Sequence, residues 1–315
     1  LILEGTQLSA LDLGASVLHV ALLDLRANPA LTTLMRPGLV IPLSSSLTIV
    51  DHPALRQCDA QAFALGHAGN HTIRGNNPAP CTCAPIHVPG DLILDEPADA
   101  VTHACVESVG GSLVVQNHPR LEQVTLPLLT SVGHSAELVY TFGNPARQGD
   151  KRVITLPSLV SIGQDLTMEG DFTALAPMGL SVGMNSLTSV GGSIELYATS
   201  GTLSGLSGLT HHAGDIHVHG PNLDVNGSQL MPNLTEVGGT LRVEGFYAFT
   251  NFFGNVESVG GNLEIIDLRN QGGFAKLHTV AGDVVLRPEF MSPLARLASV
   301  GGGLRLENTA LLSLD

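Results

Sequence analysis

The sequence predicts an all-β parallel solenoid, on the evidence of a short repeated motif and the regular interval between its copies. The motif is clearest at Val109-Gly110-Gly111-Ser112-Leu113-Val114-Val115, and close copies begin at Val190, Val237, Val259 and Val300. The apolar-x-apolar triplets end at Leu25, Ile49, Ile73, Leu94, Val115, Tyr140, Met168, Leu196, Val218, Val243, Ile265, Leu286 and Leu306, at intervals of 20 to 28 residues. A fixed short period is typical of solenoids, in which each unit buries its apolar face against its neighbours. We therefore expect about thirteen coils.

The composition is consistent with this fold and excludes some functions. The 315 residues include 36 Gly and no Trp, and only 13% are charged, which suits short strands and tight turns. A net charge of −14 would repel a phosphate backbone, so no nucleic-acid partner is expected. No run of about 18 apolar residues is present, so no transmembrane segment is expected either. The chain does not begin with Met, and we expect that any export signal or anchor lies outside this processed or trimmed chain.

The chain is expected to form a single solenoid over residues 1–315, with degenerate coils in residues 1–105. Each of Leu23-Asp24-Leu25 and Leu47-Thr48-Ile49 is followed by a turn that contains Pro, and Pro suits a corner because it cannot donate to a strand ladder. Several prolines then crowd the region between Cys58 and Cys105, where we expect insertions looped out between coils.

Residues 106–315 carry the regular coils. Val-Gly-Gly and Asn-x-x corners separate three apolar pairs in each coil, which predicts a roughly triangular cross-section. Within each triplet the outer residues point inward and the middle residue points to solvent, because side chains alternate along a strand. We expect right-handed coils, since right-handed crossovers dominate between parallel strands.

The four cysteines are spaced about one coil apart. Cys58 and Cys81 are separated by 23 residues and Cys83 and Cys105 by 22 residues. Neighbouring strands about 4.8 Å apart fall within the Cα separation that a disulfide accepts, so we predict the disulfides Cys58–Cys81 and Cys83–Cys105 and an oxidising compartment. The alternatives are a zinc site that uses the same thiols with His87 or His103, and free buried thiols.

The repeat resembles the receptor L-domain family, a leucine-rich β-helix, and especially its many-coil versions in bacterial surface and fungal cell-wall proteins. The resemblance rests on the L-x-x-V-G-G-x-L-x-I-x-x-N-x-x-L pattern and is good from about Val106 to Leu306. It implies an extracellular module for ligand binding or structure, and it transfers no catalytic residue. The chain has too few cysteines for the cysteine-rich neighbours of the receptors, and it runs much longer as one array.

The middle residues of the triplets form an exposed column, and four consecutive coils place Glu195, His217, Arg242 and Glu264 in it. These side chains are candidates for a ligand-binding face, and the alternative is a solvated charge ladder. His219 lies on the same strand face as His217, so the pair is also a weak candidate for a metal site, with Glu195 as the nearest third ligand. Ordinary exposed histidines are the favoured interpretation, and no metal or other cofactor is expected.

The aromatic residues Phe246, Tyr247, Phe249, Phe252 and Phe253 are concentrated in one region. They predict either a cap over a widened core, which is the favoured interpretation, or an exposed patch for a partner.

From these features we expect a non-enzymatic recognition, adhesion or scaffolding module, exported to a cell surface or extracellular assembly, that binds a protein or glycan. The alternative is a carbohydrate-active β-helix enzyme, a polysaccharide lyase or hydrolase, that works on the face from Glu195 to Glu264. The apolar end at Leu311–Leu314 further predicts end-on contact with another domain or subunit.

Overall fold

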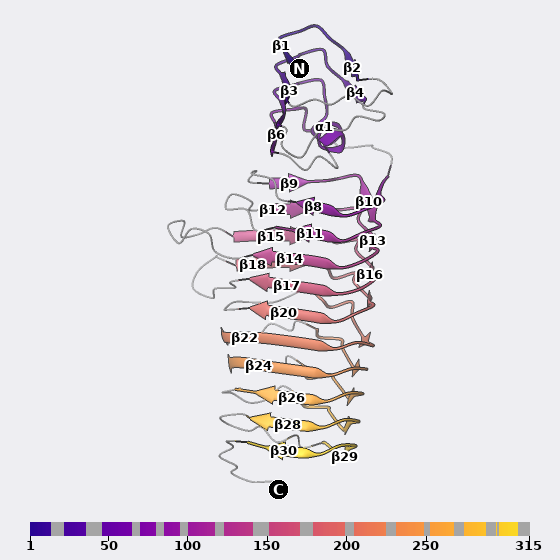
Figure 1. Cartoon of the computed structure of the whole chain (residues 1–315), viewed down its shortest axis with the longest axis vertical. Coiled ribbons are helices and arrows are strands. Elements are labelled where there is room, and N and C mark those ends of the chain that lie inside the picture. Colours follow the sequence, from indigo (N-terminus) through magenta and orange to yellow (C-terminus); the bar gives the residue numbers. More distant parts are fainter. Residues whose placement is uncertain are drawn as a thin grey trace.

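The computed structural model shows a parallel β-solenoid (Figure 1). It describes residues 1–13, 22–35, 46–64, 70–79, 85–94, 100–116, 123–140, 151–170, 179–198, 205–224, 231–248, 253–267, 274–287, 294 and 296–307. No helix among these residues is long and apolar enough to cross a membrane. All the strand pairings in the sheets described below are parallel.

The described strands form two stacks. In the N-terminal stack, β1 (Ile2–Glu4), β3 (Leu22–Arg26), β5 (Ser46–Val50) and β6 (Asn70–Arg74) make one sheet, and β2 (Ala10–Asp12) pairs with β4 (Thr33–Met35). The helix α1 (Gln57–Ala64) follows β5 and buries Ala60 and Phe63 in the core of this stack. The crowded prolines predicted only insertions in this region, and the helix was not predicted.

The main stack is built on a ten-stranded sheet, called here the long sheet. Its strands are β8 (Leu92–Leu94), β11 (Leu113–Val115), β14 (Ala136–Tyr140), β17 (Leu166–Gly170), β20 (Ile194–Ala198), β22 (Ile216–Asp224), β24 (Leu241–Ala248), β26 (Leu263–Ile266), β28 (Val284–Arg287) and β30 (Leu304–Leu306). They stack in chain order and enclose about nine turns of solenoid.

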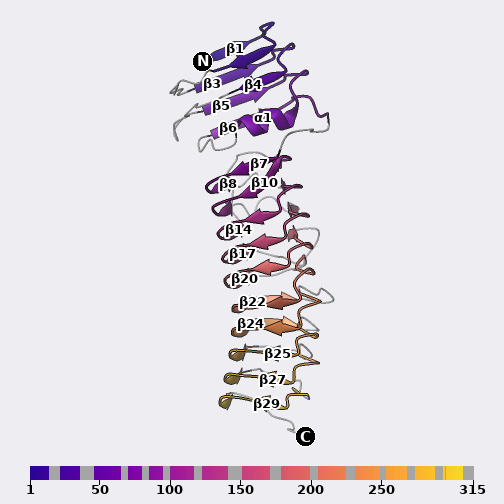
Figure 2. The same ribbon diagram turned by 90° about the vertical axis from the view of Figure 1, so that its right-hand side faces the viewer.

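The short strands that lead into the Val-Gly corners form a second face, called here the Val-Gly face. This face is turned toward the viewer in Figure 2. Its strands are β7 (Ile86–Val88), β10 (Val106–Val109), β13 (Ser131–Val132), β16 (Ser161–Ile162), β19 (Ser189–Val190), β21 (His211–His212), β23 (Glu236–Val237), β25 (Ser258–Val259), β27 (Thr279–Val280) and β29 (Ser299–Val300). A third face consists of β9 (Ala100–Thr102), β12 (Gln123–Thr125), β15 (Lys151–Thr155) and β18 (Gly179–Gly183). The coils of this part of the main stack therefore contribute strands to three separate sheets. The triangular section expected from the repeat stays a prediction.

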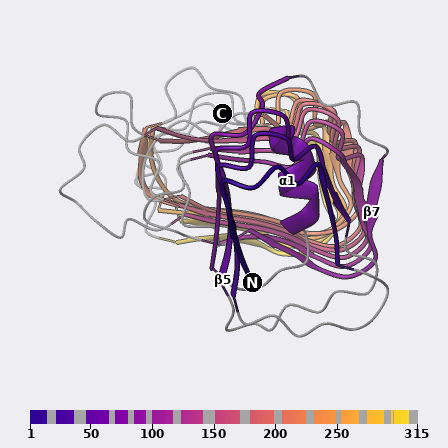
Figure 3. The same cartoon turned by 90° about the horizontal axis from the view of Figure 1, so that it is seen from above.

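The expectation of about thirteen coils in one continuous array is not confirmed. No sheet of the described residues joins the two stacks, and each stack has its own apolar core. Seen along the long axis, the N-terminal strands run across the direction of the strands in the main stack (Figure 3). A physical reason is given by α1, which lies between β5 and β6 in the chain and packs against β4 and β6. The helix stands where a third strand would continue the β2–β4 sheet toward the main stack.

The expected register is wrong in one coil. Leu113 pairs with Ala136 and Val115 with Leu138, so the triplet is Ala136-Glu137-Leu138 and does not end at Tyr140. The spacing from Val132 to Ala136 equals that from Val109 to Leu113, and this corner length decides which residue enters the sheet first.

The glycines of the Val-Gly face allow successive coils to come into close contact. A side chain added at Gly133 would collide with the carbonyl of Gly110, and one at Gly163 with the carbonyl of Gly133. Neither glycine has a positive φ, so close backbone approach is what requires glycine at these corners.

The N-terminal stack uses a different corner. Gly5, Ala27, Asp51 and Gly75 all have positive φ at the same point of successive coils. The residues that follow the last three of them, Asn28, His52 and Asn76, are buried and hydrogen-bonded to neighbouring coils. Glycine tolerates this left-handed backbone region at Gly5 and Gly75, and aspartate adopts it more readily than most residues. The buried amides of Asn28 and Asn76 donate to backbone carbonyls of neighbouring coils.

Candidate functional site

The most connected group of polar side chains lies on the outer face of the long sheet. It comprises Glu195 and Tyr197 on β20, His217 and His219 on β22, Arg242 and Glu244 on β24, and Glu264 on β26. We call these seven residues the central cluster. Their strands occupy the middle of the main stack in Figure 1.

The strand register brings the central cluster together. Glu195 pairs with His217, His217 with Arg242, and Arg242 with Glu264, which makes one outward column. Tyr197, His219 and Glu244 make a second column two residues further along the same strands. Residues i and i+2 of a strand point to the same side, so both columns face outward while the intervening Leu196, Val218 and Val243 are buried.

Arg242 connects the carboxylates at one end of the cluster. Its guanidinium donates to Glu244 Oε2 through Nη2 at 2.8 Å and to Glu264 Oε2 through Nη1 at 3.1 Å. Burial disfavours the ionised form of Glu244, but the hydrogen bond and charge of Arg242 outweigh it and lower the pKa of that carboxyl. These contacts raise the pKa of Arg242 and keep the guanidinium charged. This end of the cluster is therefore a network of fixed charges.

Two imidazoles and a phenol form the other end. The ring centroids of Tyr197 and His217 are 5.7 Å apart in an edge-on arrangement, and those of His217 and His219 are 6.5 Å apart. Burial, followed by the nearby charge of Arg242, lowers the pKa of His217, so this imidazole is neutral at pH 7. The Tyr197 hydroxyl donates to Glu195 Oε2 at 3.1 Å, and burial together with the Glu195 charge raises the pKa of Tyr197.

The sequence identified five of the seven residues and missed two. Glu195, His217, His219, Arg242 and Glu264 lie together as the alternation pattern predicted. Tyr197 and Glu244 were missed because the motif defines a strand of three residues, whereas β20 has five residues and β24 has eight. Continuing the alternation from the middle residue of each triplet to the residue two positions later would have found both.

The histidine pair meets a different carboxylate from the one expected. Glu244 Oε2 lies 3.9 Å from His217 Nε2 and 3.8 Å from His219 Nδ1, whereas Glu195 accepts the hydrogen bond of Tyr197. The same Glu244 oxygen is engaged by Arg242. Across the described ranges, no group of three or more His, Cys, Asp or Glu residues is arranged to hold a metal ion.

The alternative prediction of an exposed aromatic patch for a partner is wrong at Phe253. This side chain is 1% exposed, and its ring stacks on Phe274 with centroids 5.9 Å apart, so it belongs to the core and not to a partner surface. Phe246 and Tyr247 lie on β24, but only their backbone is described, and Phe249 and Phe252 lie outside the described residues. The cap over the core, the interpretation favoured from the sequence, agrees with the position of Phe253.

Cys58 and Cys105 lie near the junction between the stacks. Cys58 and Cys105 are both disulfide-bonded, which excludes them as thiolate ligands of zinc or as free thiols. Cys81 and Cys83 lie outside the described residues, so the pairings Cys58–Cys81 and Cys83–Cys105 stay predictions.

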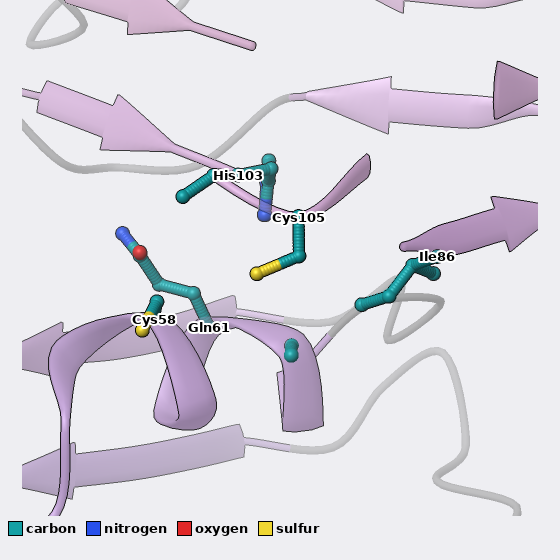
Figure 4. A pocket seen from close by; sticks show the side chains of 7 residues that line it. Cys58, Gln61, Ile86, His103 and Cys105 are labelled. Carbon is teal, nitrogen blue, oxygen red and sulfur yellow. The ribbon is translucent and has the colours of Figure 1, made fainter. Parts of the chain in front are cut away.

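Figure 4 shows Cys58 and Gln61 of α1 facing His103, Cys105 and Ile86 of the main stack across a small gap. The other histidine of the zinc alternative, His87, accepts or donates a hydrogen bond with Ser108 Oγ at 2.8 Å.

Comparisons with protein-family models, with curated proteins and with solved structures found no match for this chain. Its function must therefore be argued from the long sheet and the central cluster.

Proposed function

We propose that this chain is a non-enzymatic module for recognition, adhesion or scaffolding that binds a protein or glycan partner through the outer face of the long sheet. The observation that carries the proposal is the central cluster itself, in which charged and aromatic side chains from four successive strands form one connected outward surface. A binding face needs such fixed donors, acceptors and rings, because preorganised groups lose little conformational entropy when a partner docks.

The charge state of the carboxylates favours binding over catalysis. A glycosidase or lyase of the alternative class needs a carboxyl group that holds a proton as general acid, and its pKa is then raised. In the central cluster Arg242 contacts both Glu244 and Glu264, and the pKa of Glu244 is lowered. Glu244 is therefore suited to accepting hydrogen bonds and not to donating a proton.

The proposal extends to the type of solenoid and to its location. The L-domain-like pattern of Val-Gly-Gly and leucine triplets supports an L-domain type of module that works outside the cell or at its surface. Disulfide-bonded Cys58 and Cys105 support an oxidising compartment, where such bonds persist. End-on contact of the stack with another domain or subunit stays part of this proposal.

The first test is binding of the purified chain to a glycan array and to intact cells. We expect binding without turnover, and we expect Arg242→Ala to weaken it at least about tenfold, because truncation removes the cation that orders two carboxylates. Glu257→Ala is the control, since Glu257 is an exposed carboxylate that directly precedes β25 of the Val-Gly face and does not lie on the long sheet. Equal loss in both variants would contradict the proposed face.

A reducing-end assay on every bound polysaccharide separates the two functions. Release of reducing ends or unsaturated sugars, abolished by Glu195→Ala or Glu264→Ala, would replace the proposal with the enzyme alternative. Binding with no such release supports recognition.

A further inference from the structure

A histidine interrupts an apolar column on the Val-Gly face. The inward residues of successive strands on this face are Val109, Val132, Ile162, Val190, His212, Val237, Val259, Val280 and Val300. His212 is 3% exposed, as closely packed as its apolar neighbours in the column. The central cluster does not involve this side chain.

The ladder of the Val-Gly face is broken where His212 enters it. The strands β7, β10, β13, β16 and β19 form one sheet and β21, β23, β25, β27 and β29 form another, so β19 and β21 are successive strands that do not pair. At the next step along the chain, Gly238 N donates to His212 O at 2.7 Å and Gly239 N donates to Gly214 O at 3.1 Å. The corresponding bonds from Ala213 and Gly214 back to β19 are absent among the described residues.

The missing ladder bonds could be due to His212 or to the neighbouring Ala213, and a second coil that also contains alanine distinguishes the two. Ala213 and Ala281 both replace the first glycine of the motif, and a side chain at this position crowds the preceding coil. Ala281 nevertheless donates to Val259 O at 2.9 Å, and Gly282 donates to Gly261 O at 2.9 Å. The inward residue beside Ala281 is Val280, whereas beside Ala213 it is His212. The larger and polar His212 therefore accounts for the broken ladder.

The surroundings of His212 suit only a neutral imidazole. Its Nε2 lies 3.2 Å from the Asp215 carbonyl oxygen, and its Nδ1 is buried with no hydrogen-bond partner among the described residues. Burial lowers the pKa of His212 below its ordinary value of 6.5, and the Asp215 carbonyl and charge oppose this only in part. Protonation would put a charged and unpaired N–H into the apolar column, which is costly.

The nearby charged groups cannot neutralise a proton on this ring. The Asp215 carboxylate accepts the Thr240 backbone N–H at 2.6 Å and is exposed. Glu236 of β23 pairs in register with the exposed His211, and on the other side β19 offers only Ser189 and Val190. Protonation of His212 therefore destabilises the conformation in which this ring is packed into the stack, called here the closed state.

We propose that Thr210–Asp215 is an acid-sensitive joint of the solenoid, a segment that detaches from the stack on acidification while β22 stays paired in the long sheet. The segment lacks ladder bonds on the side of β19, so fewer bonds hold it than hold the corresponding segments of other coils. The long sheet is intact here, since Ile194 pairs with Ile216 and Leu196 with Val218.

The sign of the pH dependence follows from linkage. A group whose pKa is lowered in the closed state binds its proton more readily in the open state, so the closed state is fully favoured above the unfolded pKa and loses stability as the pH falls below it. The equilibrium for opening should rise by up to about tenfold for each pH unit below about 6.5, until the pKa of the closed state is reached.

Hydrogen exchange of the whole chain between pH 7.5 and 5 tests the joint, with rates expressed as protection relative to an unstructured peptide at the same pH. We expect protection to fall at Gly238, which donates to His212 O, and at Ile194, which donates to Asp215 O, and to hold at Gly260, which donates to Val237 O. His212→Val should abolish the fall and should fold, because valine occupies this column in most other coils. The exposed His211→Ala is the matched control and should respond like the unmodified chain. The proposal is overturned if His212→Val keeps the acid response, or if protection at Gly238 and Ile194 does not fall in the unmodified chain.

Discussion

At the scale of the residue, the central cluster depends on Arg242 more than on any other side chain. The guanidinium donates hydrogen bonds to two carboxylates on two strands. Burial is the larger cause of the lowered pKa of His217, and the charge of Arg242 lowers it further. Its side chain is 39% exposed, so solvent screening limits what the ion pairs contribute to the stability of the fold. We therefore assign Arg242 mainly to ordering the surface.

Arg242→Ala should raise the pKa of Glu244, because the burial that disfavours its ionised form would then be unopposed by a bonded cation. A lowered pKa in the folded state contributes stability above the unfolded pKa that is lost as the pH falls through the folded pKa, and the variant should lose this contribution. NMR titration of the Glu244 carboxyl measures the change, and urea unfolding at pH 7 should show a loss of at most about 1 kcal/mol. Arg305→Ala, which removes an arginine that pairs with Glu307 at 69% exposure, should leave the Glu244 titration unchanged. An unaltered Glu244 titration in Arg242→Ala would contradict the network.

At the scale of the element, the repeated unit is a corner followed by a strand. The residue between the glycines and the triplet reinforces this corner, because its side chain accepts from the backbone of the next coil. Asp91 bonds Ser112 N and Asp165 bonds Ser193 N, both at 2.7 Å. The corners therefore combine glycine, for close approach, with a short polar side chain that satisfies an exposed amide.

Gly261→Val should destabilise the main stack by about 1 to 3 kcal/mol, the usual range for overpacking. A Cβ atom at Gly261 would lie 2.6 Å from the carbonyl carbon and 2.8 Å from the carbonyl oxygen of Gly239, and backbone atoms in a paired ladder cannot move away. Thermal or urea unfolding followed by circular dichroism measures the loss.

Gly90→Val is the matched control for this substitution. Gly90 holds the same position of the motif in the first coil of the main stack, and a Cβ there meets nothing within 4 Å. We expect a change within about 0.5 kcal/mol, as for most surface substitutions. Equal losses at Gly261 and Gly90 would show that close approach of the coils does not explain the glycines.

At the scale of the whole molecule, the described strands form two stacks of coils. Each stack has separate sheets and a separate core, and α1 lies between them (Figure 1). In a solenoid each coil contacts mainly its neighbours, so a local loss of stability spreads through pairing and packing and weakens where these stop. The two stacks should therefore lose structure separately.

Asn76→Ala tests this independence. The buried Asn76 amide donates to Ile49 O at 3.1 Å and to Gln57 Oε1 at 3.0 Å, and its oxygen accepts from His52 N at 3.1 Å. Leaving such buried groups unpaired costs about 1 to 3 kcal/mol. Hydrogen exchange should show lower protection in β3 and β5 and unchanged protection from β14 to β28.

Asn77→Ala is the control at the next position in the chain, since the hydrogen bond that its side-chain oxygen accepts from Ala79 N at 2.9 Å is exposed to solvent. Protection should change little in this variant. An equal loss of protection from hydrogen exchange in both stacks of Asn76→Ala would show that the chain unfolds as one unit.

The repeat by itself determined the parallel solenoid, the position of the Val-Gly corners and the face that carries Glu195, His217, Arg242 and Glu264. These features are local, because alternation along a strand and a fixed corner length decide which side chains point outward. Most of the central cluster could be found in this way, and Tyr197 and Glu244 directly follow the last residue of the motif in their coils.

The tertiary structure alone decided the division into two stacks, the position of α1, the register of Ala136-Glu137-Leu138 and the broken ladder at His212. Each of these depends on how one coil meets the next, and a repeat pattern describes each coil separately. A histidine in a valine position and an alanine in a triplet are single exceptions in the sequence. Their consequences come from stacking, where the neighbouring coils determine whether a side chain is accommodated, buried or left without its ladder bonds.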